Sequence, residues 1–233
     1  MNSRKAVPPP YPTRPLGYRG KRLLDVCAAS FGLILLAPVF VLVALAVRLT
    51  SGRPVIFRQR RPGFAERPFE IFKFRTLTEA RDERGELLPD SQRLTRLGRF
   101  LRRSSLDELP ELWNVLRGDM SLVGPRPLLM QYLPYFTARE RLRFSVRPGI
   151  TGLAQVSGRN LLGWDERLEM DVQYVEGLSF SADMRILWRT AAAVLAGRGA
   201  AADADEVETW LDEERSAGGV GQLARRGECD AAV

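Results

Sequence analysis

A run of 22 residues without a charged side chain, Val26–Val47, constrains this chain more than any other feature of its sequence. As a helix the run would be about 33 Å long, enough to cross a bilayer core of about 30 Å. Pro38 lies near its middle, where a proline removes a backbone hydrogen bond and bends a helix. The run therefore predicts a membrane element with a break.

Basic residues flank the run on both sides: Lys21 and Arg22 precede it, and five arginines lie between positions 48 and 61. A spanning helix keeps its positive excess on the cytoplasmic side of the membrane. Symmetric flanks therefore favour a re-entrant hairpin over residues 21–50, broken at Ala37 and Pro38, with both ends on that side. A signal peptide is the alternative, because Ala44–Ala46 resembles a cleavage site, although the run is long for a signal core.

Charge and composition limit the partners this chain could bind and the reactions it could catalyse. The chain has 35 basic and 28 acidic residues, and because residues 199–233 carry a net charge of −6, residues 1–198 carry +13. A basic body favours an anionic partner: nucleic acid, acidic lipid or a phosphorylated substrate. Histidine is absent from the sequence, which excludes histidine-based catalysis and histidine metal ligands. Catalysis here would rest on carboxylates, arginines and a hard metal ion. The two cysteines do not indicate a disulfide framework, which suits a reducing compartment.

The pattern predicts an α+β protein with a mostly helical cytosolic domain and a small β-hairpin. We expect a flexible basic arm over 1–20, the re-entrant element over 21–50, a catalytic domain over 51–198 and an acidic, mobile tail over 199–233. The predicted elements are strands at Val55–Arg58 and Phe69–Thr76, helices at Arg93–Arg103, Trp164–Leu178 and Ser181–Ala196 (capped by Ser181), and an amphipathic helix ending the segment Leu128–Val146. Such a basic amphipathic helix can lie on an anionic membrane surface, although a helix on a soluble core is the commoner case.

Lys73 and Arg75 lie two residues apart in the second predicted strand, so they are expected on one face, where they would clamp a phosphate. A solvent-facing pair on an edge strand fits the spacing equally well.

Asp107 and Glu108 form an acidic pair in the segment SLDELPELWNVLRGDMSLVGPRP. With Ser105 they match a helix capping box, and acids in a first turn suit the helix dipole, so the local pattern favours a structural role. Pro110 points the other way, because it would fall at the fifth helical position of a helix capped by Ser105. We therefore expect the helix to begin later and to leave Asp107 available for chemistry.

Arg126 lies between Pro125 and Pro127, in a stiff turn that fixes the direction of its guanidinium group. Guanidinium binds phosphate through two parallel hydrogen bonds. Carboxylates beside fixed arginines indicate Mg²⁺ bound together with a phosphorylated substrate. A carboxylate can also attack phosphorus and form an acyl phosphate.

The segment RPGITGLAQVSGRN, residues 147–160, is rich in glycine, and its polar side chains Gln155, Arg159 and Asn160 form a possible substrate loop. A purely structural turn is equally compatible with this composition.

Together these segments resemble the bacterial sugar transferase family, the small monotopic phosphoglycosyl transferases. The matching segments are KRLLDV before the apolar run with its central proline, FKFRT, SLDELPELWNVLRGDMSLVGPRP, RPGITGLAQVSGRN and WDERLEMDVQYV. They cover about residues 18–197. Many members have Ser-Pro where this chain has Ala37-Pro38, so the bend is expected to persist at a less certain angle.

The resemblance implies transfer of a sugar-1-phosphate from a UDP-sugar to polyprenyl (undecaprenyl) phosphate at the cytoplasmic face of the bacterial inner membrane. Asp107 would attack the β-phosphate, expel UMP and carry the phosphosugar, supported by Glu108 and Mg²⁺. The phosphate- and uridine-binding motifs of the family map to Lys73, Arg75, Pro125–Pro127 and Arg147. Membrane lipid is an implied partner. Both substrates carry phosphate, which explains the basic body without nucleic acid.

Two alternatives remain at this stage: a basic, membrane-anchored module that binds anionic lipid or nucleic acid, and a scaffold in which the acidic pair only caps a helix. The sequence leaves open the sugar, the glycan pathway, a possible homodimer and the role of the acidic tail.

Overall fold

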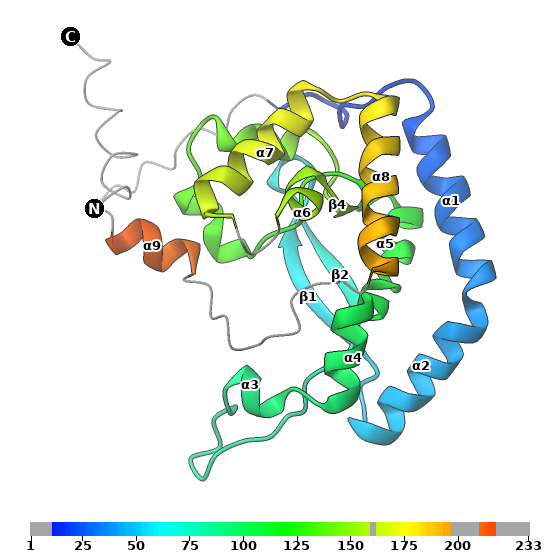
Figure 1. Ribbon diagram of the computed structural model, residues 1–233. Helices are drawn as coiled ribbons and strands as arrows, with labels where there is room; N and C mark the ends of the chain where they lie inside the picture. Colours follow the sequence, from blue (N-terminus) through cyan, green and yellow to red (C-terminus); the bar gives the residue numbers. More distant parts are fainter. Residues whose placement is uncertain (1–10, 159–161, 197–209, 218–233) are drawn as a thin grey trace.

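The computed structural model describes residues 11–158, 162–196 and 210–217. Its fold is α+β, with helices arranged around a central β-hairpin (Figure 1). The α-helices are α1 (Lys21–Leu35), α2 (Ala37–Thr50), α3 (Asp90–Arg93), α4 (Arg96–Ser104), α5 (Glu111–Arg117), α6 (Leu153–Ser157), α7 (Trp164–Glu176), α8 (Phe180–Leu195) and α9 (Leu211–Ala217). The 3₁₀-helices are η1 (Phe64–Glu66), η2 (Leu106–Glu108), η3 (Met130–Tyr135) and η4 (Glu140–Ser145). The strands are β1 (Ile56–Pro62), β2 (Pro68–Phe74), β3 (Ser121–Val123) and β4 (Gly149–Thr151).

The apolar run forms a helix pair with a break, as predicted. α1 ends at Leu35, Leu36 joins the helices, and Pro38 falls in the first turn of α2, where its missing N–H group is tolerated. The two helices are bent by 63° relative to each other. Among the described residues no helix taken alone is both long and apolar enough to cross a membrane, whereas by length and composition the bent pair could.

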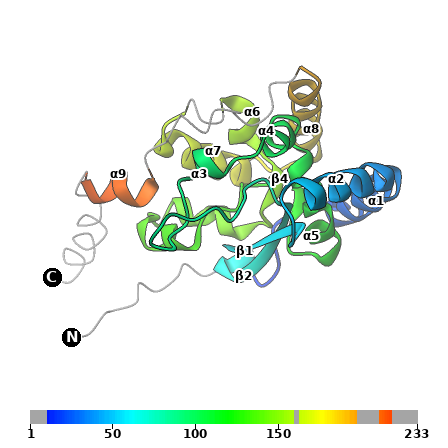
Figure 2. The same ribbon diagram turned by 90° about the horizontal axis from the view of Figure 1, so that it is seen from below.

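Much of the apolar surface of this pair is uncovered. Eight large apolar side chains are more than half exposed: Leu23, Phe31, Ile34, Leu35, Val41, Leu42, Leu45 and Leu49. In both views α1 and α2 lie at the opposite end of the molecule from α9 (Figure 1 and Figure 2). An exposed apolar surface of this extent is characteristic of a site that contacts lipid or another macromolecule.

The predicted hairpin is confirmed. β1 and β2 pair antiparallel, with Ile56 opposite Phe74 and Pro62 opposite Pro68. Ile71 and Phe74 are buried and belong to clusters that also contain residues of α1 and α2, so the hairpin is the surface on which the helix pair is seated.

A second strand pair, β3 with β4, is parallel and was not expected from the sequence. Glycine is required where these strands meet. A β-carbon on Gly124 would lie 2.4 Å from the carbonyl oxygen of Arg147, and one on Gly149 would lie 2.1 Å from the amide nitrogen of Gly124. These two glycines of the Arg126 and Arg147 segments therefore allow backbone to pack against backbone, which favours the structural interpretation of the glycine-rich loop.

Three local expectations were wrong. The amphipathic helix expected at the end of Leu128–Val146 is the short 3₁₀-helix η4, and Pro134 lies within a second one, η3. The basic segment Arg93–Arg103 contains a break, because α3 ends at Arg93 and α4 begins at Arg96. The cap of α8 is Ser179, whose hydroxyl accepts from the amide of Ala182, rather than Ser181.

Part of the acidic tail is folded against the body. Leu211 of α9 is fully buried in a cluster with Tyr132 and Trp164. Arg215 is also buried and forms ion pairs with Glu140, at 2.7 Å, and Asp165, at 2.7 Å. The expectation of a mobile tail does not describe residues 211–217.

Candidate active site

The acidic pair lies in a tight turn between two helices. α4 ends at Ser104, Ser105 adopts a left-handed conformation with φ of 56°, and Leu106–Glu108 form the single 3₁₀ turn η2 before α5 begins at Glu111. The Ser105 side chain makes no capping hydrogen bond. The capping-box interpretation is therefore wrong, and the expectation that the helix begins later is confirmed, with α5 beginning at Glu111.

Asp107 is 8% exposed. Burial and the neighbouring charge of Glu108 raise its pKa to about 6, although Lys73, Arg126 and Arg102 lower it. This carboxyl group therefore titrates close to neutral pH, and the cations around it favour its ionised form.

Glu108 is the centre of the charge cluster. Its Oε1 accepts from Lys73 Nζ at 2.6 Å and from an Arg126 guanidinium nitrogen at 2.8 Å. Burial favours the neutral acid, but the positive charges of Arg126 and Lys73 prevail and hold the pKa of Glu108 well below its usual range. Glu108 is therefore a permanent anion.

A third acid, Glu111, completes the cluster and was missed in the sequence. It is 1% exposed, and one of its oxygens lies 3.2 Å from Lys73 Nζ. Burial and the charge of Glu108 raise its pKa to about 8. The available signal was its spacing of three residues from Glu108, which brings both carboxylates to one side of the turn.

The Pro125–Pro127 turn holds Arg126 at the cluster. The carbonyl of Pro125 accepts from Gly149 N at 3.0 Å, that of Arg126 from Arg143 at 2.7 Å, and that of Pro127 from Arg61 at 3.3 Å. The backbone is thus fixed at three successive carbonyls while 43% of the Arg126 side chain stays exposed. This arrangement can present a guanidinium group to an anionic ligand.

Two of the predicted phosphate-binding arginines are engaged elsewhere. β2 ends at Phe74, so the alternation that would place Arg75 beside Lys73 stops one residue short. Arg75 donates to the carbonyls of Leu77 and Arg53 instead. Arg147 donates to the carbonyl of Gly118. The cation that joins Lys73 and Arg126 near Asp107 is Arg102, whose Nε donates to Thr76 Oγ1 at 3.1 Å.

A cavity of about 410 Å³ opens beside the cluster. Its charged or polar lining includes Glu108, Arg126, Ser105 and the ion pair of Arg143 with Asp171 (2.8 Å). Gln155 also lines the cavity, whereas Arg159 and Asn160 lie outside the described residues. Its apolar lining consists of Leu36, Leu109, Leu112, Leu128, Ile150, Ala154, Trp164, Leu168 and Val194.

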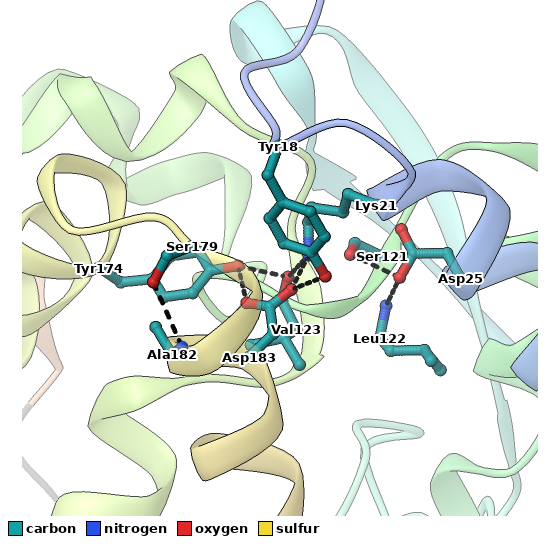
Figure 3. Close-up of polar contacts among 10 residues, drawn as sticks. All are labelled: Tyr18, Lys21, Asp25, Ser121, Leu122, Val123, Tyr174, Ser179, Ala182 and Asp183. Atoms are coloured by element: carbon teal, nitrogen blue, oxygen red, sulfur yellow. Dashed lines mark hydrogen bonds and ion pairs between the residues drawn. The ribbon is translucent and has the colours of Figure 1, made fainter.

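The amino-terminal end of α1 is tied to the domain by a buried polar network (Figure 3). Lys21 Nζ contacts Asp183 Oδ2 at 2.6 Å and donates to the carbonyl of Val123 at 3.1 Å. The other oxygen of Asp183 accepts from Tyr174. One turn along α1, Asp25 accepts from the amide of Leu122 and the hydroxyl of Ser121, each at 3.0 Å. Lys21 is thus one of the positive residues that flank the apolar run, and its side chain is also a buried partner of β3 and α8.

The chemistry of the acids fits a hard divalent cation. Asp107 and Glu108 supply two carboxylates, and within the described ranges no group of three or more acidic, histidine or cysteine side chains is arranged to hold a metal ion. Mg²⁺ takes few protein ligands and completes its octahedron with water and substrate phosphate oxygens. The adjacent carboxylates of Asp107 and Glu108, beside Lys73 and Arg126, are compatible with such a partial ligand set.

Comparison with known proteins identifies the family of this chain. The model of the bacterial sugar transferase family matches residues 17–197. The chain is 51% identical to "Uncharacterized sugar transferase EpsL" of Bacillus subtilis over 179 residues, covering 77% of this chain and 89% of that protein. It is 44% identical to "UDP-glucose:undecaprenyl-phosphate glucose-1-phosphate transferase" of Caulobacter vibrioides, covering 75% and 69%. It is 39% identical to "Exopolysaccharide production protein ExoY" of Rhizobium meliloti, covering 80% and 90%.

The matched range begins before α1 and ends after α8, so it includes the helix pair, the acidic turn, the Arg126 turn and the cavity. The chain therefore belongs to the bacterial sugar transferase family and is an enzyme of the phosphoglycosyl transferase type.

Proposed function

We propose that this enzyme transfers a sugar-1-phosphate from a UDP-sugar to polyprenyl phosphate in two steps, with Asp107 as the nucleophile. The observation that carries the proposal is the pairing of two unlike carboxyl groups in one turn. Glu108 is held as an anion by Lys73 and Arg126, while the buried Asp107 has a pKa of about 6 and no such direct ion pair among the described residues.

In the first step an oxygen of Asp107 attacks the β-phosphorus of the UDP-sugar. The bond from that phosphorus to the oxygen bridging the two phosphates breaks, and UMP leaves with the electron pair. Asp107 then carries the sugar phosphate as an acyl phosphate. The carboxylate needs no general base to be activated, which suits a sequence without histidine.

In the second step a phosphate oxygen of the polyprenyl phosphate attacks the same phosphorus, and the Asp107 carboxylate is released. The product is a polyprenyl diphosphate sugar, and the enzyme returns to its starting state. Arg126 and Lys73 would stabilise the negative charge that gathers on the phosphoryl oxygens in both steps.

Asp107 and Glu108 would hold Mg²⁺, which would neutralise the diphosphate of the donor. Three basic residues of the chain itself would bind and orient the diphosphate of the donor. They are Arg126 in its fixed turn, Lys73 in β2 and Arg102 in α4.

Placement at the cytoplasmic membrane face follows from the same proposal. The exposed apolar side chains of α1 and α2 would enter one leaflet, and the positive residues at both ends of the pair would stay at the headgroups. One relative is named for exopolysaccharide production, so we propose that the reaction begins the assembly of a polysaccharide.

Intact-protein mass spectrometry tests the proposal. Purified enzyme mixed with Mg²⁺ and a panel of UDP-sugars, UDP-glucose first because a relative is named for it, should gain the mass of one sugar phosphate and release UMP without any lipid. Asp107→Asn should form no adduct and lose at least about a thousand-fold in turnover.

Glu83→Asn serves as the control, because Glu83 is an exposed acid outside the site. Near-normal turnover by Asp107→Asn would exclude Asp107 as the nucleophile. Salt-sensitive lipid binding with no UMP release from any donor would instead support the membrane-anchored binding module.

A further inference from the structure

The cavity beside the acidic turn has two chemically different parts. At one end lie Glu108, the chain neighbour of the proposed nucleophile, and the half-exposed guanidinium group of Arg126. The remaining lining has nine aliphatic or aromatic side chains, and it also has the polar side chains of Ser105, Arg143, Thr151, Gln155, Arg167, Asp171 and Thr190. A site of this kind suits an amphiphile whose anionic head meets Arg126 and whose hydrocarbon part lies against the apolar lining.

The apolar part of the cavity reaches the membrane helices. Leu36, the residue that joins α1 to α2 at the bend, lines it together with Leu112 of α5. Val194, in the last turn of α8, is another lining residue, and its neighbour Leu195 is 88% exposed. The cavity therefore extends from the charged cluster to the bend between α1 and α2, the helices that carry eight exposed large apolar side chains.

We propose that this cavity binds the phosphate-proximal isoprenoid segment of the acceptor lipid, and that Leu36 and Val194 are specificity-determining residues for that acceptor. The inference rests on the proposed function, because it assumes that the enzyme has a lipid phosphate acceptor. About 410 Å³ lies in the range of cavities for ligands of drug size, which corresponds to a short segment of the lipid.

The aliphatic and aromatic side chains of the lining favour the acceptor over the nucleotide donor. A uridine and a sugar present many hydroxyl and carbonyl groups, each of which loses free energy when it is buried against leucine without a partner. An isoprenoid chain loses none and gains about 25 cal/mol for each Å² of apolar surface removed from water. Arg126 lies at the junction, where the phosphate of either substrate must meet Asp107.

The two half-reactions separate this inference from the proposed function. Val194→Trp adds bulk to the cavity, and Leu195→Trp adds the same side chain at the adjacent, exposed position outside the cavity lining. We expect Val194→Trp to form the sugar phosphate adduct from the UDP-sugar at the wild-type rate. Its KM for detergent-solubilised polyprenyl phosphate should rise at least tenfold, while Leu195→Trp matches the wild type in both steps.

Adduct formation serves as the check that each variant is folded. If Val194→Trp forms no adduct, Leu36→Trp provides the same test from another position in the lining. A normal acceptor KM in a variant that forms the adduct would overturn the inference. So would slowed adduct formation with a normal acceptor KM, because that result would assign the cavity to the donor. Absence of an adduct in the wild type would instead count against the proposed covalent mechanism.

Discussion

Lys73 lies between the partly buried Glu108 and the buried Glu111, and this arrangement has a measurable cost. Its Nζ contacts Glu108 at 2.6 Å and Glu111 at 3.2 Å, so one cation serves two carboxyl groups. Glu108 also forms an ion pair with Arg126, whereas the one ion pair of Glu111 within the described part of the chain is with Lys73, and Glu111 takes up a proton more readily. When the pH is high, the ionised Glu111 therefore destabilises the folded protein.

Glu111→Gln should flatten the pH dependence of stability. The pKa of Glu111 is about 8 in the folded protein against 4.5 as its ordinary value, so between these values the folded state binds more protons and stability falls as the pH rises. The slope from one proton is at most about 1.4 kcal/mol per pH unit. Chemical unfolding in detergent and a chelator, from pH 5.5 to 8.5, measures it.

Glu83→Gln is the matched control, since it makes the same chemical change at an exposed position and should keep the wild-type slope. An unchanged slope in Glu111→Gln would show that Glu111 keeps an ordinary pKa in the folded protein.

The residues of the site show what sequence can and cannot locate. Asp107, Glu108 and Arg126 were identified because acidic pairs and proline-fixed arginines are local patterns. Arg75 was expected beside Lys73 because strands alternate, but the strand ends before it. Arg102 joins the cluster only through the fold, whereas Glu111 had a local signal that was overlooked, its spacing of three residues from Glu108.

At the scale of elements, α1 is attached through charges rather than through its apolar surface alone. Lys21 and Asp183 are both buried, and each also has a neutral partner, Val123 for Lys21 and Tyr174 for Asp183. Removing one member of a buried ion pair leaves the other charge without compensation.

Lys21→Met should therefore destabilise the protein by about 3–5 kcal/mol, and adding Asp183→Asn should recover part of the loss. A double-mutant cycle measured by chemical unfolding in detergent gives the coupling. Arg19→Met, at an exposed position two residues away, should change stability by less than about 0.5 kcal/mol. Additive effects of the two substitutions would show that Lys21 and Asp183 do not interact.

The elements themselves were predictable where the signal was local. The helix bend at Pro38 and the β1–β2 hairpin follow from a proline and from turn residues between two apolar segments. The β3–β4 pair joins residues 28 positions apart, from Ser121 to Gly149, and was missed. Its requirement for Gly124 and Gly149 comes from the approach of two backbones, so composition alone could not separate it from a ligand loop.

At the scale of the molecule, the bent pair and the cavity determine how the enzyme would meet its membrane. If α1 and α2 re-enter the leaflet from which they came, both ends of the pair lie on the cytoplasmic side. We predict that Thr13→Cys and Thr50→Cys, each in a Cys27→Ser, Cys229→Ser background, resist a membrane-impermeant maleimide in spheroplasts. Both should react after lysis.

The native chain with only Cys27 and Cys229 replaced gives the labelling background. Labelling of one position before lysis and of the other only afterwards would show that the pair crosses the membrane.

The link between Lys21 and Asp183 also has a consequence for biosynthesis. The two residues are 162 positions apart, so a ribosome adding roughly 5–20 residues per second completes Asp183 about 10–30 s after Lys21. During the first part of that interval the apolar helices leave the ribosome, while α8 and β3 are not yet translated. Contact with lipid would precede folding of the catalytic domain, and the unpaired Lys21 would hold the start of α1 at the headgroups until its partner is translated.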